Sequence, residues 1–187
     1  MQPEGFSKRV DRLISCAYNH SVVVKKLNPR ESLGFLAWKV TRLLTNDLNA
    51  RFHQAGVEVT VEQWRALIPV LKLDGLTQGR LGEILSQEKT GVSRLVAALE
   101  KRGLLRRTTC SVDKRVKHVH ITDAGRDLVA ATIDMAIESR DEMIADIDPD
   151  ELAVCMRVLW QIIEPTLDED IRAQDEACTI YLEKNNE

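Results

Sequence analysis

The chain has 187 residues, of which 44% are apolar and 29% charged, and its formal net charge is −3. This composition is typical of a globular protein with one domain and appended helices. No apolar run reaches the roughly 20 residues of a membrane span, and the N-terminus lacks the charged-then-apolar order of a signal peptide, so we expect a cytoplasmic protein without a membrane segment.

The small net charge hides a segregation along the sequence. Residues 1–71 carry +4, residues 72–126 carry +6, and residues 127–187 carry −13. A basic segment of this kind is expected of a nucleic-acid-binding face. The acidic C-terminal third should stay away from phosphate.

The cysteines are scattered and favour a reducing compartment. None of them has the CxxC spacing of a structural zinc site, and their positions do not suggest a disulfide framework. They are Cys16, Cys110, Cys155 and Cys178.

Residues 1–31 are expected to form an N-terminal extension. One face of a short helix would carry Val10, Leu13 and Ala17, and Pro29 then breaks the pattern. The basic residues of this segment could touch a DNA backbone, but charge runs are more often solvated surface. An arm packed against a neighbouring subunit is the favoured interpretation.

Two helices are predicted next. The first covers residues 32–55, with a serine N-cap and one long apolar stripe, and it ends at Gly56. Thr60, with Gln63 three residues later, forms a capping-box pattern for the second helix. Pro69 should kink this helix or tighten its last turn.

Two short helices and a hairpin are predicted in the basic segment. One helix begins at Leu76-Thr77, and another begins near Lys89 and ends at Gly103, where a helix C′ glycine belongs. Leu105–Cys110 and Lys117–Ile121 then read as two strands joined by a polar link. This order of elements predicts a winged helix-turn-helix, a DNA-reading module.

Two long helices complete the predicted pattern. Thr122 caps the first, and Asp148, followed by a proline, begins the second, which stops before Pro165. Both are apolar over more surface than a small domain could cover, and a single helix-turn-helix reads few base pairs. We therefore expect a dimer, with residues 168–187 as an acidic tail.

Three runs carry a resemblance to the MarR family of bacterial transcriptional regulators: LTQGRLGEIL, VSRLVAALEKRGLLRR and DKRVKHVHITDAG. The family's wing pattern is Asp-x-Arg, five residues, an apolar residue with Thr, and a Gly three positions on. It stands here as Asp113, Arg115, Ile121, Thr122 and Gly125. The resemblance covers roughly residues 32–167.

The resemblance implies a mainly α (α+β) fold, with a winged helix-turn-helix at residues 58–122 and dimerisation helices at residues 32–57 and 123–167. It also implies a homodimer that binds a pseudo-palindromic double-stranded DNA operator, most often as a repressor. Family members commonly release DNA when a small phenolic or anionic compound binds. No cofactor is expected, and no phosphate loop or nucleophile motif suggests an enzyme.

Each residue of the DNA module is assigned a role by its chemistry. The N-terminal end of the second helix should read base edges in the major groove: Lys89, Thr90, Gly91, Ser93 and Arg94. Three strand residues should contact phosphate: Arg106, Arg107 and Lys117. Arg115 at the wing tip should enter the minor groove, beside Lys114. The resemblance implies that Asp113 is the partner that holds the Arg115 side chain.

The effector pocket can be placed only by the resemblance. Four residues on the first two long helices could line it: Trp38, Arg42, His53 and Trp64. Burial of both tryptophans in the core is the favoured interpretation.

Three alternatives remain open. Cys110, His118 and His120 lie across the two wing strands and could ligate a metal such as zinc, although the sequence places no further ligand. Cys16 could be a thiol sensor, but Gly34 occupies the position of the family's peroxide-sensing cysteine. Finally, the winged helix could bind a protein partner instead of DNA.

Overall fold

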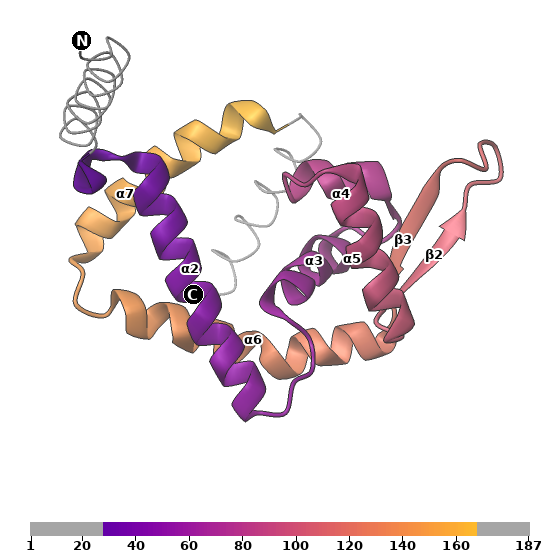
Figure 1. Cartoon of the computed structure of the whole chain (residues 1–187), viewed down its shortest axis with the longest axis horizontal. Helices are drawn as coiled ribbons and strands as arrows, with labels where there is room; N and C mark the ends of the chain where they lie inside the picture. The colour runs from indigo at the N-terminus through magenta and orange to yellow at the C-terminus, as the bar shows by residue number, and fades with distance from the viewer. Residues whose placement is uncertain (1–27, 168–187) are drawn as a thin grey trace, which may run out of the picture. The chain divides into compact units, whose positions relative to one another are not determined.

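The structure, a computed structural model, describes residues 28–167, most of which are helical, with one small sheet (Figure 1). In chain order the elements are η1 (Pro29–Glu31), α2 (Leu33–Gln54), α3 (Val61–Lys72), β1 (Leu76–Thr77), α4 (Gln78–Ile84), α5 (Lys89–Lys101), β2 (Leu105–Thr109), β3 (Lys117–Ile121), α6 (Asp123–Ile144), α7 (Pro149–Ile163) and η2 (Glu164–Thr166). The predicted mainly helical class is confirmed. The chain divides into two compact units, residues 1–47 and 48–187, so α2 begins in one unit and ends in the other.

The predicted helix starts are confirmed by their caps. Each capping side chain accepts hydrogen bonds from backbone N–H groups that the first turn of a helix leaves without partners. The pairs are Ser32 with Phe35 N, Thr60 with Gln63 N, Thr122 with Gly125 N, and Asp148 with the N–H groups of Asp150 and Glu151. The Gln63 side chain also accepts from Thr60 N, which completes the capping box.

The helix predicted to start at Leu76-Thr77 begins at Gln78, and a short strand that was not predicted precedes it. Leu76 and Thr77 do not begin a helix but form β1, which pairs antiparallel with β3 through Leu76↔Val119 and Thr77↔His118. The sheet order among the described strands is therefore β1-β3-β2. Two residues are too few to show a strand periodicity, and the pairing exists only because β3 offers its second edge. Thr77 then caps α4.

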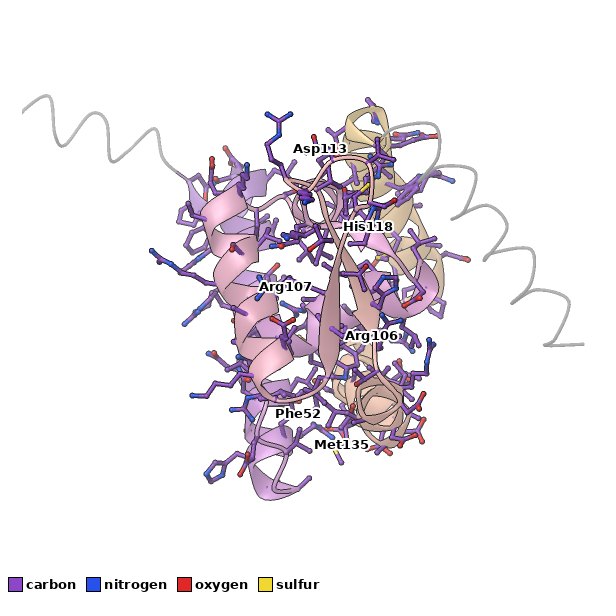
Figure 2. The ribbon with its side chains drawn as sticks, turned by 90° about the vertical axis from the view of Figure 1, so that its right-hand side faces the viewer. Phe52, Arg106, Arg107, Asp113, His118 and Met135 are labelled. Atoms are coloured by element: carbon purple, nitrogen blue, oxygen red, sulfur yellow. The ribbon has the colours of Figure 1, made fainter. Side chains whose placement is uncertain are left out.

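The core lies in the second unit, between α3, α4, α5 and the inner face of the sheet. Its fully buried members include Leu67, Leu81, Val96 and Val119. The C-terminal end of α2 contributes Phe52 (labelled in Figure 2), which packs edge-on against Trp64 with ring centroids 6.0 Å apart.

Trp64 belongs to this core, as the favoured interpretation predicted. Its indole Nε1 donates a 2.8 Å hydrogen bond to Thr132 Oγ1 on α6. The hydroxyl of Thr132 in turn donates to Leu128 O at 2.6 Å, so both buried polar groups are satisfied. This contact ties α3 to α6.

Three helices expose long apolar faces. In α7 no residue is buried, although the helix is rich in large apolar side chains. The exposed large apolar residues of α2, α6 and α7 are Leu33, Phe35, Leu36, Trp38, Val40, Leu43, Ile133, Ile137, Met143, Val154, Met156, Val158, Trp160, Ile162 and Ile163. Such patches mark interaction surfaces in proteins. Within residues 28–167, no helix is both long and apolar enough to cross a lipid bilayer.

The end of α5 and the start of α6 meet at one backbone junction. Gly103 has φ +71°, and the N–H groups of Gly103 and Leu104 bond to the carbonyls of Glu100 and Leu99, as in a Schellman motif. Leu104 O accepts Thr122 N at 3.1 Å, and Thr122 Oγ1 donates to Gly103 O at 2.6 Å. These bonds hold the base of the hairpin.

A substitution of Gly125 tests how closely α6 approaches Leu104. A Cβ on Gly125 would stand 2.3 Å from Leu104 O and 2.8 Å from Ile121 Cγ1, so Gly125→Ala must displace α6 or the junction. We expect the free energy of unfolding, measured by urea titration, to fall by about 1–3 kcal/mol.

Gly34→Ala is the matched control, because a Cβ there meets nothing within 4 Å. This change should leave stability unchanged or raise it by up to about 1 kcal/mol. Equal effects of the two changes would contradict the close approach of α6 to Leu104.

Candidate nucleic-acid interface

Helices α4 and α5 form a tight helix-turn-helix. Gly82 lets α5 approach, because a Cβ there would lie 3.3 Å from Val92 Cγ2. In the turn, Ser86 has φ +50°, and Gln87 N bonds to Gly82 O at 2.9 Å. The buried side of α5 is formed by Val92, Val96 and Leu99. The orientation of α5 is therefore set by its apolar side, and its polar side faces solvent.

The predicted base-reading residues all lie on the exposed side of the first turns of α5. They are Lys89, Thr90, Gly91, Ser93 and Arg94. Glu88 occupies the N-cap position, but its side chain makes no capping hydrogen bond. The helix start thus combines exposed N–H groups with exposed cationic side chains, an arrangement that suits an anionic partner.

The wing is the hairpin of β2 and β3, and Figure 1 shows it projecting beyond α5. Its tip carries Asp113 (labelled in Figure 2) and Arg115, which form the predicted pair. Asp113 Oδ1 accepts Arg115 N at 2.9 Å and Nε at 3.2 Å, and Oδ2 accepts Nη2 at 3.3 Å. The hydrogen bonds from Arg115 lower the pKa of Asp113. The Arg115 side chain is 92% exposed, so it is oriented while remaining free to enter a groove.

The two arginines of β2 differ in their surroundings (both labelled in Figure 2). Arg106 is exposed, and no ion pair involving it occurs among residues 28–167. Arg107 is half-buried and bonded to Glu100 of α5: its backbone N–H reaches Oε1 at 3.2 Å and its Nε reaches Oε2 at 2.9 Å. A further bond joins Nη2 to Oε2. The phosphate contact predicted for Arg107 therefore competes with an intramolecular ion pair.

Among the remaining predicted DNA contacts, Lys114 is exposed near the wing tip. Lys117 is partly buried, and its Nζ donates to Thr109 Oγ1 at 2.7 Å across the hairpin. The interface residues thus come from three places: the start of α5, the strands of the wing and its tip.

The two wing histidines bond to the turn between α3 and β1. His118 Nδ1 lies 2.9 Å from Gly75 O, and His120 Nδ1 lies 3.0 Å from Asp74 Oδ2. Since a carbonyl only accepts, His118 Nδ1 carries a proton. The Gly75 carbonyl raises the pKa of His118, and the His120 contact lowers that of Asp74.

Cys110 lies at the end of β2. Hydrogen bonds from the backbone N–H groups of Asp113 and Val112, and a further one with His118, hold the pKa of its thiol below the usual value. His120 uses both ring nitrogens, with Nε2 at 3.0 Å from Thr108 Oγ1. Across the described residues, no group of three or more His, Cys, Asp or Glu side chains is arranged to hold a metal ion.

One protein-family model matches the part of the chain that contains the helix-turn-helix. Residues 56–116 match the model described as MarR family. The match spans the helix-turn-helix and the first half of the wing, up to the residue after Arg115. This part of the chain is similar to the MarR family.

Several solved structures share the fold along nearly their whole length. The MepR–DNA complex of S. aureus is 22% identical, with a TM-score of 0.63 over 72% of this chain and 98% of that one. CouR of Rhodococcus jostii RHA1, bound to p-coumaroyl-CoA, is 24% identical, with a TM-score of 0.63 over 76% and 99%. A MarR family transcriptional regulator of Silicibacter pomeroyi DSS is 25% identical, with a TM-score of 0.64 over 74% and 92%.

The four residues assigned to an effector pocket differ in their surroundings. Trp64 is buried and bonded to Thr132, whereas His53 is exposed on the last turn of α2. In the other unit, Arg42 is exposed and Trp38 is 57% exposed, stacked at a tilt on Phe35. Burial of Trp38 within its own chain was thus predicted wrongly. Cys16 and the expected arm before residue 28 lie outside the described residues.

Sequence reasoning missed two acidic residues of the winged helix, Glu100 and Asp74. Each bonds to a backbone N–H and to a cationic or titratable side chain: Glu100 to Arg107, and Asp74 to Ile121 N and His120. Both partners are brought close only by the tertiary fold. The one available signal was that these acids stand within a strongly basic segment.

Proposed function

We propose that this protein is a transcriptional regulator that binds a pseudo-palindromic operator as a homodimer, most simply as a repressor. The observation that carries the proposal is the pairing, in one MarR-family lobe, of an exposed cationic start of α5 with a wing tip whose Arg115 is held by Asp113. The helix start suits base reading in the major groove, and an oriented guanidinium suits the narrow minor groove.

The homodimer is supported by the exposed apolar faces. Trp160, Met156 and Ile162 of α7 are all exposed in the single chain. A second copy supplies an equally apolar surface, and a two-fold dimer presents two α5 helices about one turn of DNA apart. We propose residues 32–57 and 123–167 as the dimerisation region and residues 58–122 as the DNA-binding region.

A small phenolic or anionic compound is proposed as the effector. The support is the structural likeness to CouR, which was solved with p-coumaroyl-CoA bound. Trp38, Arg42 and His53 are exposed and chemically suited to such a compound. Trp64 is better explained as core.

Binding to DNA from the gene's own upstream region tests the proposal. A gel shift that fails at low salt, with dimeric protein, would favour a winged helix that binds a protein partner instead.

The proposed dimer can be tested by placing a charged side chain on the apolar face of α7. Ile162→Glu places a carboxylate on the apolar face of α7, where burial against a second copy would be costly. We expect wild type to sediment as a dimer at micromolar concentration and Ile162→Glu as a monomer. Gln161→Glu adds the same charge at the neighbouring exposed position and should remain dimeric. A monomeric wild type would rule out the two-half-site arrangement.

Base reading is tested at Arg94. Arg94→Ala should weaken operator binding by about 1–3 kcal/mol and relax base preference, because a bidentate contact to a base edge is lost. Lys101→Ala, at the exposed C-terminal end of the same helix, is the control. Equal loss of affinity for operator and random DNA would make Arg94 a phosphate contact.

The Asp113–Arg115 pair predicts whether Asp113→Asn weakens or strengthens operator binding. Asp113→Asn removes a negative charge near DNA, which by simple electrostatics should tighten binding. We expect weaker operator binding, because Arg115 loses its orienting partner.

In a double mutant with Arg115→Ala the Asp113 change should have no further weakening effect. Arg115→Ala alone should reduce the salt slope by roughly 0.9 per lost contact. Tighter binding by Asp113→Asn across a salt titration would show that this carboxylate is only a surface charge.

A further inference from the structure

Two adjacent arginines of β2 face opposite sides of the wing. Side chains alternate along a strand, so Arg106 points away from the face that Arg107 shares with buried Leu105. Arg107 also stands opposite Val119, which is fully buried, in the register of β2 and β3. The Arg107 guanidinium therefore lies against the C-terminal turn of α5.

Glu100 receives that guanidinium. It lies in the last turn of α5, and it accepts three hydrogen bonds from Arg107: one from the backbone N–H and two from the guanidinium. The side chains are 35% and 30% exposed, so the pair is partly shielded from water. The Arg107 contact lowers the pKa of Glu100. A carboxylate near a helix C-terminus opposes the macrodipole, and Arg107 offsets that cost.

The pair closes a ring around the turn that joins α5 to β2. From Glu100 the chain passes through the Schellman turn at Gly103, enters β2 at Leu105 and returns to Glu100 at Arg107. The backbone hydrogen bonds lie within the turn, whereas the Glu100–Arg107 contact joins the helix to the strand through side chains. The carboxylate bridges both elements directly. A small rotation at this root would be magnified at the wing tip.

We propose that Glu100 is a positioning residue of the DNA interface, which withdraws Arg107 from phosphate and sets the angle of the wing relative to the recognition helix. This inference rests on the proposed function. In this role the two neighbouring arginines act differently. Arg106 faces solvent and is available to phosphate, whereas Arg107 connects β2 to the end of α5 through Glu100.

The opposite interpretation is that Glu100 merely competes with DNA for Arg107. The two differ in sign. If Glu100 competes, Glu100→Gln frees a cation and removes a negative charge, so DNA binding tightens. If Glu100 positions the wing, the same change weakens operator binding, because the wing must be ordered on binding.

The experiment measures operator and random-DNA affinity over a salt titration for wild type and Glu100→Gln, Arg107→Gln, the double variant and Arg106→Gln. Glu100→Gln and Arg107→Gln should each lower operator affinity roughly three- to tenfold, and the double variant should be no worse than either. Affinity for random DNA should change little. Arg106→Gln should reduce the salt slope by about 0.9 per lost contact, and Arg107→Gln should leave the slope unchanged.

Tighter operator binding by Glu100→Gln, or a smaller salt slope for Arg107→Gln, would overturn the inference. Equal losses on operator and random DNA would also overturn it, since a merely less stable fold affects both alike. If Glu100→Gln does not fold, Glu100→Asp serves instead: it keeps the charge, but its shorter side chain cannot reach both groups of Arg107, so operator affinity should still fall.

Failure of the proposed function is distinguishable from failure of this inference. In the first case wild type itself binds no operator. In the second, wild type binds and Glu100→Gln binds equally well or better. A double-mutant cycle on thermal unfolding without DNA adds a check on the Glu100–Arg107 contact, because it should show coupling between the two residues.

Discussion

Helix α5, both strands of the wing and α6 all depend on the backbone of Gly103 and Leu104. The helix ends there in a left-handed glycine, β2 leaves from it, and Leu104 O receives the N–H of Thr122 as β3 gives way to α6. Gly125 then approaches this carbonyl more closely than any side chain would allow. The helix-turn-helix with its wing and helix α6 are thus fixed to one another through main-chain atoms, whose geometry few substitutions can alter.

Three acidic residues of the basic segment, residues 72–126, hold neighbouring side chains and backbone in place. Asp113 holds Arg115 at the wing tip, Glu100 holds Arg107 at its root, and Asp74 joins His120 to the turn before β1. Each carboxylate also accepts a backbone N–H, so it fixes chain direction as well as charge. Exposed ion pairs are worth little for stability. Their value here lies in the orientation that they give to cationic side chains and loops.

The sequence predicted those parts of the fold that depend on local chemistry. The caps at Thr60, Thr122 and Asp148 and the glycine end of α5 could be predicted from the sequence, because the partners lie within a few residues of each other. The Asp113–Arg115 pair was expected from the resemblance to the MarR family. β1 was missed, because two residues carry no periodicity. The engagement of Arg107 could not be predicted either, since nothing in the sequence distinguishes it from its neighbour until strand and helix are packed together. The base-reading and effector roles remain predictions.

The exposure of helix α7 affects how long a newly synthesised chain survives before it assembles. It has 15 residues, and none is buried. Isolated helices of this length are marginal in water, and segments with few buried contacts open most readily. Until another surface covers it, this helix will exchange its amide protons quickly and offer its backbone to proteases. Covering the helix would therefore lengthen the lifetime of the chain, and the abundance of the protein would rise with the success of its assembly.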